Sequence, residues 1–294
     1  MTERRWAFAA LATAGALWGT SFLLGKLALA GVGPTWLIVL RFAIAAAVML
    51  PFVRWRRLTV TRRDLGLIAA GAVLAGPIVF VLQFEGLSRT TASSAALLVA
   101  VSAPLLALGA AWVDGERAGR TAWAAIGLST LGILLLVGAP GPGRTLLGDA
   151  MCAASMAGAV AWSLLSRRLT RRIGSLPATA LQFAAALVAL VPMAMVREGP
   201  LPAMSGGVWA SVVALGLGCT AVTFWLWNWG LARVEAARAG VFSNIEPVVG
   251  TALGVLILHD RLGPLSLAGG ALLLAAAGLA TRPDAPLAQP SVAP

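Results

Sequence analysis

The chain has 294 residues, of which 59% are hydrophobic and only 11% are charged. A soluble domain carries about 25% charged residues, so this composition excludes an ordinary soluble protein. The net charge of +11 invites a nucleic-acid partner, but the basic residues lie in short loops between apolar runs. Because such a distribution encodes membrane topology, we expect no nucleic-acid partner.

Apolar runs about as long as the ~20 residues that cross a bilayer recur from end to end. We therefore predict an all-α polytopic membrane protein embedded in a lipid bilayer. Ten transmembrane helices are expected, joined by short connections rich in Gly, Pro and Arg. They cover residues 6–30, 35–53, 65–87, 91–113, 121–138, 147–166, 177–196, 207–231, 236–258 and 263–281.

The lysine and arginine residues fall mainly on one side of this predicted arrangement. With the N-terminus in the cytoplasm, sixteen of the 22 lie in cytoplasmic segments and Lys26 and Arg41 lie within spans. The other four, Arg89, Arg144, Arg197 and Arg261, lie outside. This positive-inside bias predicts a multi-pass protein of a bacterial-type cell inner membrane, with both termini cytoplasmic. The Pro/Ala-rich residues 282–294 are expected to form a disordered cytoplasmic tail.

The two halves of the chain resemble each other at a spacing of 144 residues. The stretch "FVLQFEGLSRTTASSA" at 80–95 aligns with "FWLWNWGLARVEAARA" at 224–239, and Trp18 aligns with Trp162. We expect a first five-helix repeat over residues 1–142 and a second over 143–281. Five is odd, so the second repeat is inverted, as in many secondary transporters whose substrate site lies where the repeats meet.

Several motifs together resemble the drug/metabolite transporter superfamily of the ten-helix EamA type. They include "ALWGTSFLLGKLAL" (16–29), "GLSRTTASSAALL" (86–98) and "GLARVEAARAGVFSNIEPVVGTALGVLILHDRLG" (230–263). The resemblance covers about residues 8–281, with His259-Asp260 standing where the family usually has Gly-Glu. It implies export or uptake of small metabolites, often amino acids and their relatives, without identifying the substrate.

Polar residues interrupt the ninth predicted span, where Asn244, Glu246 and Pro247 lie near its middle. A charge at a helix centre costs about 2.5–3.5 kcal/mol on insertion scales, so we expect Glu246 to face a cavity or a partner. Pro247 also removes one backbone donor. The functional interpretation is a site for a substrate amine or a proton; the alternative is a structural carboxylate that holds a kink.

Two basic residues lie within spans. Lys26 is near the predicted outer end of the first span, and Arg41 is deeper in the second. Both side chains could simply extend to the membrane surface. The functional alternative makes Lys26 a gating residue and Arg41 an outer gate or a carboxylate-binding group. Arg41 and Glu246 together could hold both ends of an amino acid.

The remaining candidates are aromatic, amide and proline residues within spans. Trp18 and Trp162 are deep and repeat-related, which favours a place along a central pathway. Gln83 is a candidate for a cavity-facing amide or for a helix–helix contact. Asn228 shares a helix face with two tryptophans, so it lines either the cavity or the membrane interface. Pro104 corresponds to Pro247 with a one-residue slip and is a gating candidate.

Small residues at helical spacing predict close helix packing. Gly15-x-x-x-Gly19 and Gly250-x-x-x-Gly254 have this spacing. We interpret both as packing motifs and derive no oligomeric state from them.

These features favour a secondary transporter that exports small polar metabolites by alternating access, with proton coupling left open. The alternatives are a passive channel or facilitator and, much less favoured, an intramembrane enzyme. His259 is the only histidine, and the chain has neither H-E-x-x-H nor G-x-S-x-G. It also has no Walker A motif for ATP. We therefore expect no catalytic residues, no metal and no cofactor.

Overall fold

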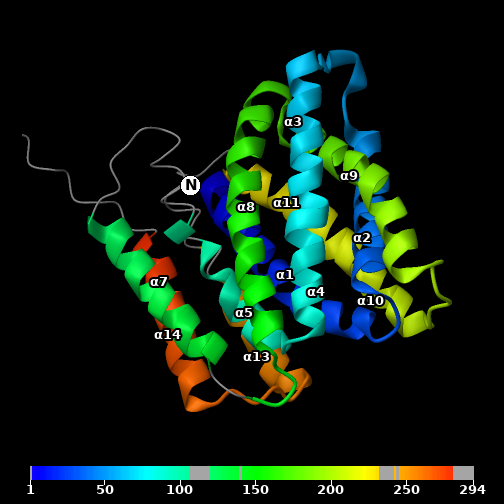
Figure 1. The fold of residues 1–294 in the computed structure, drawn as a ribbon. Helices are drawn as coiled ribbons and strands as arrows, with labels where there is room; N and C mark the ends of the chain where they lie inside the picture. The colour runs from blue at the N-terminus through cyan, green and yellow to red at the C-terminus, as the bar shows by residue number, and fades with distance from the viewer. Residues whose placement is uncertain are drawn as a thin grey trace, which may run out of the picture.

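The computed structural model describes residues 2–102, 104–105, 120–138, 141–231, 242 and 245–280, and these segments are helical apart from their connections (Figure 1). This confirms the predicted all-α class. The α-helices are α1 (Thr2–Leu29), α2 (Pro34–Met49), α3 (Arg62–Val73), α4 (Leu82–Ser88), α5 (Ala92–Val99), α7 (Arg120–Gly138), α8 (Leu146–Ile173), α9 (Ser175–Glu198), α10 (Gly206–Gly216), α11 (Thr223–Leu231), α13 (Ile245–Ile257) and α14 (Pro264–Ala280). The predicted tail at 282–294 lies outside the described residues.

Within the residues that the structure describes, six helical stretches are long and apolar enough to cross a membrane. They are Arg5–Leu29, Pro34–Phe52, Arg62–Ser88, Leu146–Ile173, Ser175–Glu198 and Gly206–Trp227. Shorter apolar helices cover Trp123–Leu136, Ile245–Ile257 and Pro264–Leu279. The predicted spans at 91–113 and 236–258 fall partly outside the described residues, so only part of each can be compared with the structure.

Hydroxyl side chains begin several of these helices. Thr61, Thr91, Thr145 and Ser205 each accept a hydrogen bond from the backbone N–H three residues later. Such caps satisfy donors that the first helical turn leaves free. Between α8 and α9, Gly174 has a φ of +89°, a left-handed conformation that a residue without a Cβ adopts readily. The turn there is tight as a result.

Two of the long stretches contain a π-helical segment, which the sequence did not predict. The segment η3 (Leu74–Val81) joins α3 to α4 and contains Pro77, whose ring nitrogen has no hydrogen to donate. The segment η4 (Leu217–Val222) joins α10 to α11. There the Thr220 hydroxyl donates to the Leu215 carbonyl at 2.9 Å. Both segments change the backbone pairing near the centre of their helices.

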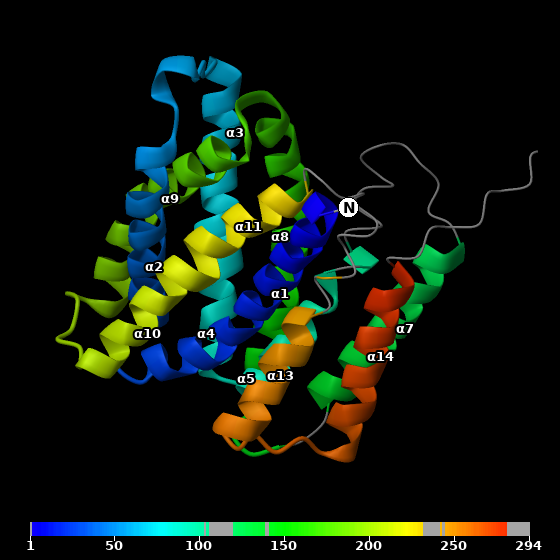
Figure 2. The same ribbon diagram turned by 180° about the vertical axis from the view of Figure 1, so that it is seen from behind.

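Helices α1 and α8 each pack against a different set of neighbouring helices. Helix α1 contacts α10, η4, α11 and α13, and it lies between α11 and α13 in Figure 2. Helix α8 contacts α3, η3, α4 and α5. Helix α2 packs against α9, whereas α7 and α14 form a pair at one side of the molecule. The buried core draws most of its residues from α2, η3, α5 and α9.

The predicted packing role of the glycine motifs is confirmed. A Cβ on Gly19 would lie 2.7 Å from the Val249 Cβ and 2.8 Å from the Glu246 carbonyl oxygen. A Cβ on Gly250 would lie 2.6 Å from the Ala96 Cβ. The absence of side chains at these glycines thus lets α13 approach α1 on one side and α5 on the other.

Replacing Gly19 with alanine is expected to lower the free energy of unfolding by about 1–3 kcal/mol, because the added methyl overpacks the α1–α13 contact. Gly127 on α7 has no atom within 4 Å of its would-be Cβ. Gly127→Ala should therefore be neutral or stabilise by up to about 1 kcal/mol through helix propensity. Equilibrium unfolding of the detergent-solubilised protein measures both changes. Equal effects of the two substitutions would contradict the close approach.

Candidate functional site

Among the described residues, Arg41 is the largest side chain that is fully buried, at 1% exposure. Its Nε donates to the Thr220 Oγ1 at 2.6 Å and its Nη2 donates to the Cys219 carbonyl at 3.2 Å. The guanidinium carbon lies 4.6 Å from the centre of the Phe80 ring and 5.4 Å from that of Phe84. Arg41 is thus held by α2, η3, α4 and η4 together, and it does not extend to the surface.

One of the three guanidinium nitrogens of Arg41 has no hydrogen-bond partner among the described residues. This nitrogen is Nη1, and it is buried. A buried, unsatisfied charged donor is costly, whereas a carboxylate placed there would receive a charge-assisted hydrogen bond. The two donors already in use fix the guanidinium plane, so the direction of the third is also fixed.

Glu246 lies in the first turn of α13 and is half-buried. Its charge and that of Arg41 act on each other, yet the two side chains form no direct ion pair among the described residues. The two opposite charges therefore attract each other without a direct contact. The structure thus brings this predicted pair into one region.

An aromatic cluster surrounds this region. Trp18 lies 5.6 Å and Trp162 lies 5.8 Å from the ring of Phe224, measured between ring centres. The two predicted tryptophans, from α1 and α8, therefore meet on the same phenylalanine. The whole cluster comprises Trp18, Phe42, Phe80, Trp162, Phe183, Phe224 and Trp227.

Gln182 on α9 contributes to this cluster, although the sequence analysis did not single it out. Its Oε1 accepts from the Trp162 indole N–H at 2.8 Å and from the Ser166 hydroxyl at 3.1 Å. Its buried Nε2 has no partner in the described segments. An amide in the middle of an apolar span was the available signal, and the same signal had selected Gln83.

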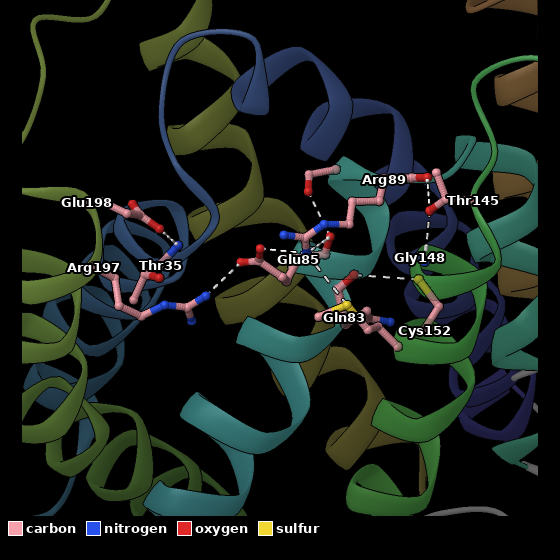
Figure 3. A network of polar contacts seen from close by, with 11 residues as sticks. Thr35, Gln83, Glu85, Arg89, Thr145, Gly148, Cys152, Arg197 and Glu198 are labelled. Carbon is pink, nitrogen blue, oxygen red and sulfur yellow. Dashed lines mark hydrogen bonds and ion pairs between the residues drawn. The ribbon is translucent and has the colours of Figure 1, made fainter.

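The other predicted site residues have less direct roles in this geometry. Gln83 is buried, and its backbone carbonyl accepts from the Cys152 thiol at 3.6 Å (Figure 3). Lys26 is half-buried, and the charge of Asp260 acts on it. Pro104 and Pro247 are both buried.

Two predicted asparagines cannot be compared with the structure. Asn244 lies outside the described residues. Asn228 belongs to α11, but its side chain is outside the description as well.

An exposed ionic network lies at the predicted outer end, where the sequence had indicated only isolated arginines. Glu85 pairs with Arg89 at 2.6 Å and with Arg197 at 3.2 Å (Figure 3). Beside it, the Glu198 carboxylate accepts from the backbone N–H groups of Thr35 and Trp36 at 2.7 and 3.1 Å. These contacts tie the end of α9 to α4 and to the start of α2.

A second ion pair at the same end is buried. Arg144 and Asp149 are 2.5 Å apart and only 3% and 1% exposed. Arg144 also donates to the Ser266 hydroxyl on α14 at 2.8 Å and to the Leu136 carbonyl on α7. The Thr90 hydroxyl donates to Asp149. One charge pair therefore fastens α7, α8, α14 and the α4–α5 connection together.

The helices and the buried polar residues define a polytopic membrane protein with a charged and aromatic interior. Comparison with known families agrees, because the EamA-like transporter family model matches residues 5–138 and again residues 146–282. The chain belongs to the EamA-like transporter family, which confirms the resemblance seen in its motifs. It is therefore a membrane transporter, which is what the family and its relatives are named as.

Individual relatives agree with this assignment. The chain is 28% identical over 269 residues to "Uncharacterized transporter YcxC" of Bacillus subtilis (strain 168), covering 87% of this chain and 86% of that protein. It is 30% identical over 178 residues to "Aromatic amino acid exporter YddG" of Ancylobacter novellus, covering 59% and 61%. One solved crystal structure, described only as a protein, has a similar fold, with a TM-score of 0.67 and 25% sequence identity. The match covers 93% of this chain and 96% of the other.

Proposed function

We propose that the protein exports small polar metabolites, such as amino acids or their derivatives, by alternating access. The free Nη1 of the buried Arg41 carries this proposal, since no other described atom satisfies it. A substrate carboxylate at Nη1 would complete the guanidinium, and Glu246 would attract the substrate amine. Export is supported by the relative from Ancylobacter novellus that is named as an aromatic amino acid exporter.

The positions of the two charged residues support a role beyond packing. The aromatic contacts Trp18–Phe224 and Trp162–Phe80 connect residues that are exchanged by the 144-residue spacing. By contrast, the positions 144 residues away from Arg41 and Glu246 hold Ala185 and Ser102. The aromatic residues thus occur in both repeats, whereas Arg41 and Glu246 each occur in one repeat only. Such asymmetry is expected for a site that binds its substrate in one orientation.

We further propose ten spans in two inverted repeats, residues 1–142 and 143–281, with both termini in the cytoplasm of a bacterial-type cell with an inner membrane. The two matches to the family model support the duplication. So do the π-helical segments η3 and η4, which lie at nearly equivalent positions of the two halves. The pairs α2–α9 and α7–α14 each join corresponding helices of the two halves. Rocking of one repeat against the other would expose the site alternately.

Counterflow in proteoliposomes tests the proposed mechanism. Vesicles preloaded with one unlabelled compound from a panel of amino acids, their amides and their decarboxylated amines would receive the labelled compound outside. A carrier accumulates label transiently, and only compounds with a free carboxylate should drive it. Entry of label without transient accumulation would indicate a facilitator whose pathway is open to both sides of the membrane at once.

Glu246→Gln is expected to abolish substrate-driven proton movement if Glu246 carries the coupled proton. Glutamine keeps the size of the side chain but cannot ionise. An internal pH dye in proteoliposomes under an amino-acid gradient measures the proton flux, with Glu85→Gln at the outer end as the matched control. Substrate movement without proton flux, unchanged in Glu246→Gln, would return Glu246 to a structural role.

A further inference from the structure

A cavity of about 270 Å³ lies between the α2–α3 connection and the α8–α9 turn. Its apolar wall is formed by Phe52 and Leu58 on one side and by Ile173 and Leu176 on the other. Two arginines, Arg54 and Arg57, also line the cavity, together with Val53 and Pro177. The connections that enclose it lie at the upper end of the molecule in Figure 1, which is the predicted cytoplasmic end. This cavity is separate from the Arg41 region.

The two lining arginines are available to bind an anion. Arg54 and Arg57 are exposed and form no ion pair with any described residue. Nearby Arg172, by contrast, is engaged with Asp64 at 3.3 Å and with the Thr61 hydroxyl at 3.4 Å. No described residue therefore neutralises the positive charge of Arg54 and Arg57 at the cavity.

The surroundings of the cavity place it at the level of lipid headgroups. Phe52 precedes the two arginines and is 71% exposed, and Trp55 lies between them in the sequence and is 54% exposed. Aromatic side chains of this kind gather at membrane–water interfaces. The volume is near the lower end of ligand pockets, which measure roughly 300–1,000 Å³. It suits a headgroup with the first part of its chains rather than a whole lipid.

We propose that this cavity binds the phosphate headgroup of an anionic phospholipid from the cytoplasmic leaflet. Arg54 and Arg57 would hold the phosphate, and the apolar wall would receive the glycerol backbone and the first methylenes. Basic pockets on the cytoplasmic side of membrane proteins suit anionic headgroups. The inference rests on the proposed sidedness but not on any transported substrate or on Arg41.

The two arginines have no counterparts at the corresponding positions of the second repeat. The positions 144 residues after Arg54 and Arg57 hold Glu198 and Leu201, and Glu198 is occupied in capping α2. The cationic cavity is therefore not a by-product of the internal duplication. It marks one membrane face, the face whose lipids carry the negative surface charge.

Native mass spectrometry of the detergent-solubilised full chain tests this site with dioleoyl-phosphatidylglycerol as the probe. Arg54→Gln/Arg57→Gln is expected to weaken binding about 25-fold, since each basic residue near an anionic surface contributes a factor of about five. Arg56→Gln/Arg62→Gln removes the same charge outside the cavity and should change binding less than threefold. Arg54→Lys/Arg57→Lys should retain most of the binding and guards against misfolding of the glutamine variant.

Three results would overturn the proposal. One is equal loss of binding in the cavity variant and in the control, which would indicate nonspecific surface charge. Another is binding of dioleoyl-phosphatidylcholine as strong as that of phosphatidylglycerol, which would mean that the arginines do not select the anion. The last is complete displacement of the lipid by an equimolar amount of inorganic phosphate, which would mean that the site takes free phosphate instead.

Discussion

Replacing Arg41 with glutamine will reduce transport of a carboxylate-bearing substrate by about 100-fold. The arginine is 1% exposed and its remaining donor points where no described residue accepts. Truncating one partner of a buried, hydrogen-bonded charge pair costs about 2–5 kcal/mol, and about 3 kcal/mol corresponds to this factor. Initial rates of labelled substrate entry into proteoliposomes measure the change.

Two variants make the Arg41 result specific. Arg89→Gln removes a positive charge from an exposed pair and should leave the transport rate within about twofold. Arg41→Lys keeps the charge but loses the forked geometry that fits a carboxylate, so its rate should lie between wild type and Arg41→Gln. Full transport by a folded Arg41→Gln protein would show that the guanidinium only packs the core.

Asp149→Asn is expected to lower the free energy of unfolding by about 3–5 kcal/mol, because it leaves the buried charge of Arg144 without its partner. The pair is almost completely buried and joins α8 to α7 and α14. Thermal unfolding in detergent, followed by circular dichroism and by size-exclusion recovery, measures the loss.

A surface ion pair supplies the matched comparison. Arg197→Gln breaks the contact with Glu85, in which the arginine is 42% exposed, and should cost no more than about 1 kcal/mol. Arg144→Met/Asp149→Leu removes both buried charges together and should recover most of the stability lost in Asp149→Asn. Equal destabilisation by Asp149→Asn and Arg197→Gln would contradict the structural role of the buried pair.

The sequence predicted the features that repeat along the chain. Apolar runs separated by short polar connections gave the helical class, and the 144-residue spacing selected Trp18 and Trp162 as related positions. The structure adds that both tryptophans contact Phe224. Charged residues inside apolar runs, Arg41 and Glu246, also stood out without any structure, because a bilayer tolerates them only with a partner or a cavity.

The partners of these residues could not be predicted from the sequence. Thr220 is 179 residues from Arg41 along the chain, and one threonine in an apolar run gives no signal of its own. Arg144 was counted only as an outer loop residue, because neither Ser266 nor Asp149 indicates burial by type. The π-helical segments were missed because the apolar pattern of a span does not distinguish i→i+5 from i→i+4 hydrogen bonding.

Labelling of the Cys219 thiol is the most direct test of alternating access, because Cys219 contacts Arg41 in the proposed site. The thiol is 3.3 Å from the Thr20 hydroxyl and the backbone carbonyl accepts from Arg41, while the residue is 1% exposed. Cys152→Ala leaves Cys219 as the only cysteine. Membrane-impermeant maleimide can then be added from either side of vesicles that contain oriented protein.

Alternating access predicts that Cys219 is labelled from both sides at measurable rates. A transported substrate on one side should change the two rates in opposite directions, because it shifts the population between the two open states. Labelling from one side only, or rates that substrate leaves unchanged, would contradict a carrier whose site lies beside Arg41.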